Sequence, residues 1–102
     1  MKTSTLLEKK HSALASFCRK NHIVKLSLFG SALTGQETVH SDIDLLVEFH
    51  PEHIPGLLTL ASIEIELSNL LGKKVDLRTA QDLSIYFRDE VITQARTAYA
   101  EA

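Results

Sequence analysis

The chain has 102 residues, the length of a single domain, and its 44% hydrophobic and 24% charged content is typical of a globular protein with one core. A formal net charge of −2 argues against a broad surface for nucleic acid or membranes, and the single cysteine, Cys18, excludes an intramolecular disulfide. No apolar run is long enough for a signal peptide or a membrane span, so we expect one cytoplasmic domain over residues 1–102.

The first half of the chain predicts a helix followed by two strands. Residues 4–21 have the apolar spacing of an amphipathic helix, on whose apolar face Cys18 is expected to pack rather than react. That face consists of Leu6, Leu7, Ala13, Leu14, Phe17 and Cys18. The apolar run from Ile23 to Phe29 predicts a strand that ends at Gly30-Ser31. Ala32-Leu33-Thr34 predicts one or two helical turns that Gly35 ends, before a polar loop over residues 36–41. In the second strand, Ile43 to Phe49, apolar residues at alternate positions predict a core face, opposite Asp42, Asp44, Leu46 and Glu48.

The second half predicts a helix, a short strand and a final helix. Residues 57–71 alternate apolar and acidic side chains in their middle, but their length and their Leu, Ala and Glu content favour a helix that Gly72 ends. Lys74 to Arg78 predicts a third strand. Thr79 and Asp82 resemble a capping box that opens a helix to about Ala100. Its expected apolar face consists of Phe87, Val91, Ala95, Ala98 and Tyr99.

This order predicts an α/β (α+β) fold, with a small mixed three-stranded sheet flanked by helices that lie mostly on one face. A full helix joins the second and third strands, as parallel neighbours require. The opposite face of the sheet is expected to stay open as a cleft near the strand ends.

Three aspartates are expected on that open face. Asp42 and Asp44 are spaced i, i+2 on one strand and therefore share a face, and Asp76 points away from the apolar side of the neighbouring strand. Carboxylates, waters and substrate phosphates are the ligands that Mg²⁺ prefers. Gly30 would let the backbone approach a phosphate, and Ser31 offers a hydroxyl and an N–H at an expected helix N-terminus. The combination predicts chemistry on a nucleoside triphosphate. Taken singly, these residues also fit a loop boundary, a tight turn and a solvated edge strand.

Other candidate residues have simpler interpretations. His50 and His53 could form a metal pair, but Pro51 and Pro55 beside them favour a solvated loop. A solvated loop position is likewise the preferred interpretation of His40. Tyr86 lies off the expected apolar face, as a partner contact or a half-exposed residue.

Gly30-Ser31, followed after ten residues by Asp42-Ile43-Asp44 and later by Lys74-Val75-Asp76-Leu77, resembles the minimal nucleotidyltransferases of the DNA polymerase β superfamily. The segment from Leu83 to Ile92 is similar to the final helix of these small proteins, so the resemblance covers nearly the whole chain. It implies a polymerase β palm-like fold and transfer of AMP from ATP to a hydroxyl. Asp42 and Asp44 would bind two Mg²⁺ ions, Asp76 would complete the catalytic metal site and help deprotonate the hydroxyl, and Gly30 and Ser31 would hold the nucleotide.

The resemblance also implies a partner. Many minimal members are antitoxins of a HEPN-type ribonuclease toxin encoded beside them, and family members can silence it by adenylylating a tyrosine near its active site. We therefore expect a hetero-oligomer.

The chain departs from the family pattern after Ser31. Arginines are common there in the family, whereas this chain has Ala32, Leu33 and Thr34. Phosphate binding is then either weaker, or supplied by Lys25 or Arg78. Three functions stay open: an adenylyltransferase antitoxin, a catalytically weak or inactive antitoxin that acts by binding alone, and a small-molecule nucleotidyltransferase. The last needs a further helical domain that 102 residues leave no room for.

Overall fold

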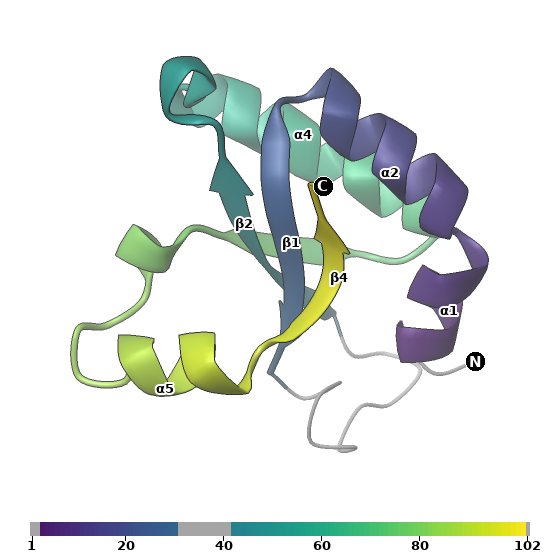
Figure 1. Ribbon diagram of the computed structural model, residues 1–102. Helices are drawn as coiled ribbons and strands as arrows, with labels where there is room; N and C mark the ends of the chain where they lie inside the picture. Colours follow the sequence, from purple (N-terminus) through teal and green to yellow (C-terminus); the bar gives the residue numbers. More distant parts are fainter. Residues whose placement is uncertain (1–2, 31–41, 102) are drawn as a thin grey trace.

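A computed structural model describes residues 3–30 and 42–101 of the chain. Within these two ranges, ten elements follow one another: α1 (Thr3–Lys9), α2 (His11–Lys20), β1 (Ile23–Phe29), β2 (Ile43–Phe49), η1 (Pro51–His53), α4 (Leu57–Leu71), β3 (Val75–Arg78), η2 (Ala80–Asp82), α5 (Arg88–Gln94) and β4 (Arg96–Ala100) (Figure 1). The strands form one sheet in the order β3-β2-β1-β4.

The pairing of the strands follows from the lengths of their connections. β2 and β3 are parallel and α4 joins them, as predicted. β1 pairs antiparallel with both β2 and β4. The sheet is therefore mixed, and the parallel pair lies at one side of it.

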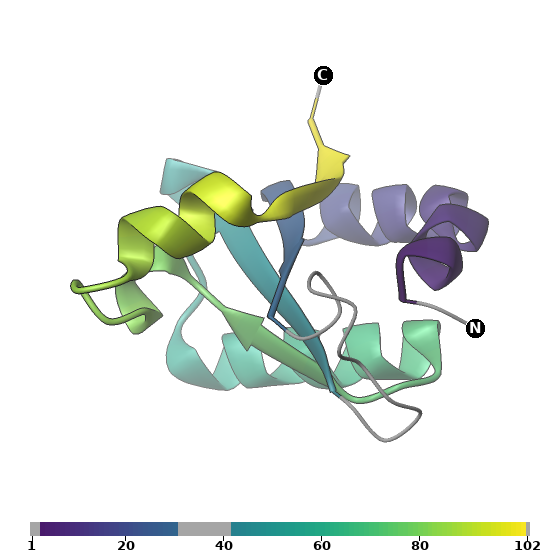
Figure 2. The same cartoon turned by 90° about the horizontal axis from the view of Figure 1, so that it is seen from below.

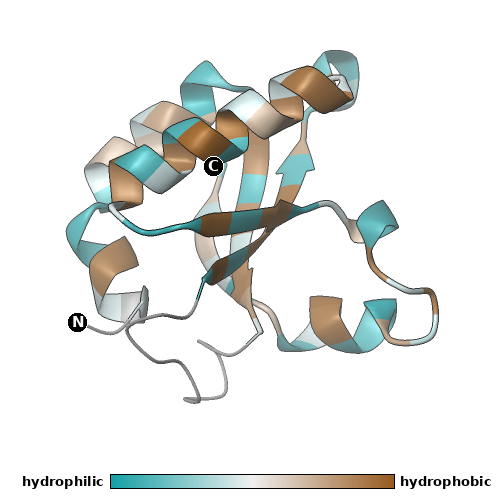
Figure 3. Ribbon diagram, turned by 180° about the vertical axis from the view of Figure 1, so that it is seen from behind, coloured by the Kyte–Doolittle hydropathy of each residue, from teal (hydrophilic) through white to brown (hydrophobic). Residues whose placement is uncertain are grey.

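The core lies between the sheet and the two helices α2 and α4, which cover one face (Figure 1). On β2 the predicted alternation is confirmed, because Ile43, Leu45 and Val47 are buried there. Leu14, Phe17 and Cys18 of α2 complete the core from the helical side, together with Leu67 of α4. Figure 3 shows the same alternation as hydrophobic and hydrophilic bands along the strands. Helix α5 lies on the other side of the sheet from α2 and α4 (Figures 1 and 2).

The predicted helix over residues 4–21 is two helices. The chain turns at Lys10, whose φ of −100° and ψ of 16° separate α1 from α2. The Lys10 Nζ donates a hydrogen bond to the carbonyl of Leu70 at 3.0 Å, near the C-terminus of α4, where free carbonyls favour a cation. Ala13, expected on the apolar face, is exposed.

The predicted helix from Thr79 to about Ala100 is wrong. The capping box of Thr79 and Asp82 forms, but it opens only the single turn η2. The chain then continues through α5 and ends in β4, which gives the sheet four strands rather than three. Pairing with β1 satisfies the backbone of this last segment, and Tyr99 packs into the core.

Within the described ranges, 3–30 and 42–101, no helix is long and apolar enough to cross a membrane. The predicted helical turn at Ala32–Thr34 and the loop over 36–41 lie outside these ranges.

Candidate functional site

Asp44 and Asp76 meet on the face of the sheet opposite the core. They are register partners on the parallel strands β2 and β3, and Phe29 of β1 is the antiparallel partner of Asp44. Both carboxylates are half-buried. The predicted placement of these two aspartates on one face is therefore confirmed, and Asp42 lies just before β2 with an exposed side chain.

Gly30 ends β1 against the Asp44 carboxylate. Its φ is +78°, a left-handed conformation that glycine adopts without steric cost. A Cβ at this position would overlap Oδ2 of Asp44 and lie 3.0 Å from its Cγ. Gly30 is thus required both by the turn and by the close approach of an aspartate, whereas Ser31 lies outside the described residues.

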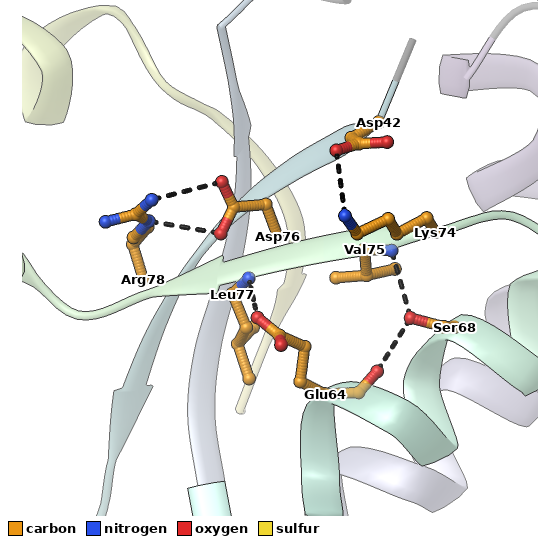
Figure 4. A network of polar contacts seen from close by, with 8 residues as sticks. All are labelled: Asp42, Glu64, Ser68, Lys74, Val75, Asp76, Leu77 and Arg78. Atoms are coloured by element: carbon orange, nitrogen blue, oxygen red, sulfur yellow. Dashed lines mark hydrogen bonds and ion pairs between the residues drawn. The ribbon is translucent and has the colours of Figure 1, made fainter. Parts of the chain in front are cut away.

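Helix α4 fixes β3, and with it Asp76, from the outer edge of the sheet. Ser68 Oγ accepts a hydrogen bond from the Val75 N–H at 2.9 Å and donates one to the Glu64 carbonyl at 2.8 Å (Figure 4). The Glu64 carboxylate accepts from the Leu77 N–H at 2.7 Å. Because Glu64 and Ser68 are spaced i, i+4, they lie on one face of the helix and satisfy alternate N–H groups of an edge strand.

Two cations of the chain face the aspartates. The Arg78 guanidinium donates to Asp76 from Nε at 3.1 Å and from Nη2 at 3.3 Å, in a bidentate pair (Figure 4). Lys74 Nζ lies 3.7 Å from Asp42 Oδ2, with the lysine side chain largely exposed. Burial, followed by the charges of Asp76 and Asp42, raises the pKa of Asp44, and Arg78 lowers it in part. Loss of solvation is therefore the main reason why the Asp44 carboxylate resists ionisation, and the neighbouring carboxylates add to it.

The donor chemistry of this cluster suits a hard divalent cation such as Mg²⁺, which takes carboxylate oxygens. In the described part of the chain, however, no three His, Cys, Asp or Glu side chains are gathered closely enough to hold a metal ion. Asp42 and Asp76 are directed at Lys74 and Arg78 instead. The carboxylates are the right kind of ligand for Mg²⁺. To bind it, the side chains of Asp42 and Asp76 have to break their ion pairs with Lys74 and Arg78.

A cavity of about 400 Å³ lies further along the same face of the sheet. Its floor is formed by the register pairs Ser27–Leu46 and Lys25–Glu48 of β1 and β2. Ile92 and Ala95, from α5 and its C-terminus, form one wall, and Thr79 to Gln81, around η2, form another. The cavity therefore begins one side-chain row beyond Asp44.

The other candidates from the sequence do not join this site. His50 pairs with Glu101 at 2.9 Å and the ring of His53 stacks on His22, so the two do not form a metal pair. Tyr86 is 92% exposed, more than the half-exposure considered for it. His40 lies outside the described residues. Cys18 is fully buried in the core, which confirms its packing role, and this burial raises the pKa of its thiol to about 12.

The sequence did not predict the two ion pairs. The cleft expected on the face opposite the core is present as this cavity, but α5 and η2 as its walls were not predicted. The i, i+2 spacing of Arg78 from Asp76 on a strand is the sequence signal for a pair on one face. Lys25 lines the cavity and does not pair with an aspartate of the cluster in the described structure. The walls of the cavity had no local signal, because α5 and η2 meet the sheet only through the tertiary fold.

Comparisons with known proteins agree with this geometry. The family model "Polymerase beta, Nucleotidyltransferase" matches residues 12–101. A predicted protein adenylyltransferase of Methanocaldococcus jannaschii is 34% identical over 76 residues, which cover 74% of this chain and 80% of the relative. A solved structure of a predicted minimal nucleotidyltransferase has a TM-score of 0.73 at 33% identity and covers 93% of this chain and 94% of that chain.

A third likeness is to a chain in the complex of the tri-AMPylated Shewanella oneidensis HEPN toxin with MNT antitoxin. Its TM-score is 0.66 at 20% identity, over 93% of this chain and 73% of that chain, and it shows a shared fold. Together, the fold, the aspartate row over Gly30 and a family model that spans most of the sequence lead to one assignment: the chain belongs to the polymerase beta nucleotidyltransferase family.

Proposed function

We propose that this chain is a Mg²⁺-dependent protein adenylyltransferase that transfers AMP from ATP to a tyrosine hydroxyl of a HEPN-type toxin and so acts as its antitoxin. The observation that carries the proposal is the register of Asp44 with Asp76 on the open face of the sheet, directly over Gly30. Family membership, and a likeness to a chain in a complex that contains an AMPylated HEPN toxin, support the reaction and the partner.

In this proposal Asp42, Asp44 and Asp76 hold Mg²⁺, which supplies positive charge to the phosphates and to the developing oxyanions. Gly30 and Ser31 hold the nucleotide. The acceptor oxygen forms a bond to the α-phosphorus, and the bond from that phosphorus to the β-phosphate oxygen breaks. Pyrophosphate leaves with that electron pair, and the hydroxyl proton passes to the Asp76 carboxylate and then to water.

The arrangement of charges supports a role for the chain's own cations. No lysine or arginine occurs between Ser31 and Ser41, so the phosphates lack basic partners there. Arg78 lies on the same face, already beside Asp76. With Asp76 holding a metal ion, the Arg78 guanidinium would be free of its carboxylate partner and would be available to hold a phosphate oxygen.

A second candidate function is neutralisation of the toxin by binding alone. Two observations favour it: Asp42 and Asp76 are paired with cations of the chain, and the residues after Ser31 carry no arginine. In that case the aspartates would be a remnant of the fold.

The deciding experiment is intact-mass analysis of the toxin encoded beside this chain. The toxin is co-expressed with the wild type, with Asp42→Asn/Asp44→Asn, or with Glu52→Gln as a matched loss of an exposed carboxylate in η1. Transfer predicts a mass gain of one or more AMP units with the wild type and Glu52→Gln only. A toxin that stays unmodified, yet is bound and silenced by the double variant as well, would favour the binding-only antitoxin.

A further inference from the structure

We infer that the cavity between α5 and the sheet takes an aromatic side chain of the acceptor protein and directs it toward the aspartate row. This inference rests on the proposed function and adds the location of the acceptor, which neither the family match nor the aspartates specify.

The order of features along the sheet supports this location. Gly30 follows Phe29, the register partner of Asp44, so the proposed phosphate site lies at one side of the aspartate row. Ser27 and Leu46, the register pair that begins the cavity, lie at the other side. Adjacent side chains on one face of a strand are about 6.6 Å apart, so the cavity begins within one residue's reach of Asp44.

The geometry of phosphoryl transfer determines on which side of the aspartate row the acceptor hydroxyl enters. In an in-line displacement the entering and leaving oxygens lie on opposite sides of the phosphorus atom. With the leaving pyrophosphate at the Gly30 side, the hydroxyl has to enter from the cavity side.

The lining of the cavity suits a ring better than phosphates. Leu46 in the floor is apolar, and so are Ile54, Ile92 and Ala95 around it. Its floor carries Lys25 next to its register partner Glu48, so the two opposite charges offset each other. A triphosphate would find little net positive charge here, whereas an aromatic ring would bury apolar surface.

The surroundings favour a protein as the source of the ring. The segment that leads into α5 exposes Ile85 and Tyr86 at 73% and 92%, with Phe87 also exposed. Ile92, which lines the cavity, is 45% exposed. An acceptor protein seated on α5 would cover these residues, while a nucleoside would leave them in water.

The test fills the cavity. Ala95→Phe and Ile92→Phe place a ring in it, and Gln94→Phe adds the same ring to an exposed position of α5 that does not line the cavity. For each variant, thermal unfolding establishes the fold. Calorimetry then measures affinity for the toxin without nucleotide, and separately affinity for a non-hydrolysable ATP analogue with Mg²⁺ and no toxin.

We expect both cavity variants to weaken toxin binding about tenfold, the effect of blocking an aromatic anchor, and to leave analogue affinity within about twofold. Gln94→Phe should change neither. Equal loss of analogue affinity would place the nucleoside in the cavity and overturn the inference, and so would unchanged toxin binding in both cavity variants.

Replacing the modified tyrosine of the toxin sharpens the result. Phenylalanine should keep the affinity, alanine should lose it, and Ala95→Phe should then cost nothing further, because the ring it displaces is gone. The proposed function fails separately, if the Asp44→Asn variant transfers AMP at the rate of the wild type. In that case the two binding measurements still show whether the cavity binds the acceptor or the nucleotide.

Discussion

Asp44 and Asp76 face the same way from adjacent parallel strands, at one register position, with Gly30 beneath the Asp44 carboxylate. Such a pair is unfavourable unless a cation is present, because like charges and burial both disfavour ionisation. The Arg78 guanidinium supplies part of this positive charge. The site is therefore built at some cost in stability, as expected where a ligand completes it.

Gly30→Ala should reduce both stability and activity. The new Cβ would meet the Asp44 carboxylate and would sit at a φ of +78°. Gly72→Ala is the matched control, since Gly72 has a φ of +71° with nothing within 4 Å of an added Cβ. The control should lose about 1–2 kcal/mol from backbone strain alone, and Gly30→Ala should lose more. Urea unfolding measures the difference, and equal losses would show that Asp44 moves aside freely.

Asp44→Asn should stabilise the metal-free protein at neutral pH. The folded state raises the pKa of Asp44 above its ordinary 3.8, so the group favours folding below that value and the advantage is lost as pH rises through the folded pKa. Removing the charge should therefore raise the melting temperature at pH 7, and the gain should fade below about pH 3.8. Thermal unfolding from pH 3 to 8 with chelator present tests this, with Glu52→Gln as the control. A gain that persists at low pH would assign the effect to packing.

Arg78→Gln should strengthen binding of a divalent cation. Arg78 occupies the Asp76 carboxylate through two hydrogen bonds, and its side chain is about half exposed. An exposed pair of this kind contributes at most about 1 kcal/mol, so the gain should not exceed about fivefold. Titration calorimetry with Mn²⁺ measures it, with Arg96→Gln on β4 as the control. Weaker binding in Arg78→Gln would mean that the guanidinium holds Asp76 in place for the metal rather than competing with it.

Much of the sheet could be predicted because its signals are local. The alternation in β2 fixed which residues are buried and, with it, the face of Asp44. Gly72 marked the end of α4 through a left-handed conformation that few other residues adopt. The length of α4 then implied that β2 and β3 are parallel, which brings Asp76 into register with Asp44.

The misassigned parts depend on contacts between distant residues. Lys10 breaks the first helix while its ammonium reaches Leu70, sixty residues away. The segment from Arg96 to Ala100 contains two alanines and has no strong alternation, so its composition allowed a helix. It is a strand because β1 offers it an unpaired edge, and local patterns carry no information about that edge.

Replacing each of the two tyrosines by alanine tests whether residues 96–100 pack against the core as strand β4. Tyr99 on β4 is 8% exposed and packs into the core, while Tyr86 before α5 is 92% exposed. Tyr99→Ala should cost about 3 kcal/mol, as for other large aromatic side chains removed from a core. Tyr86→Ala should stay within about 0.5 kcal/mol, the usual range for surface positions. Denaturant unfolding of both variants gives the comparison, and similar costs would contradict the packing of β4 against the core.

Tyr86 lies in the exposed segment that we propose contacts the acceptor protein, so its replacement should weaken toxin binding instead. The same pair of variants therefore separates a residue that stabilises the fold from one that contributes to the interface.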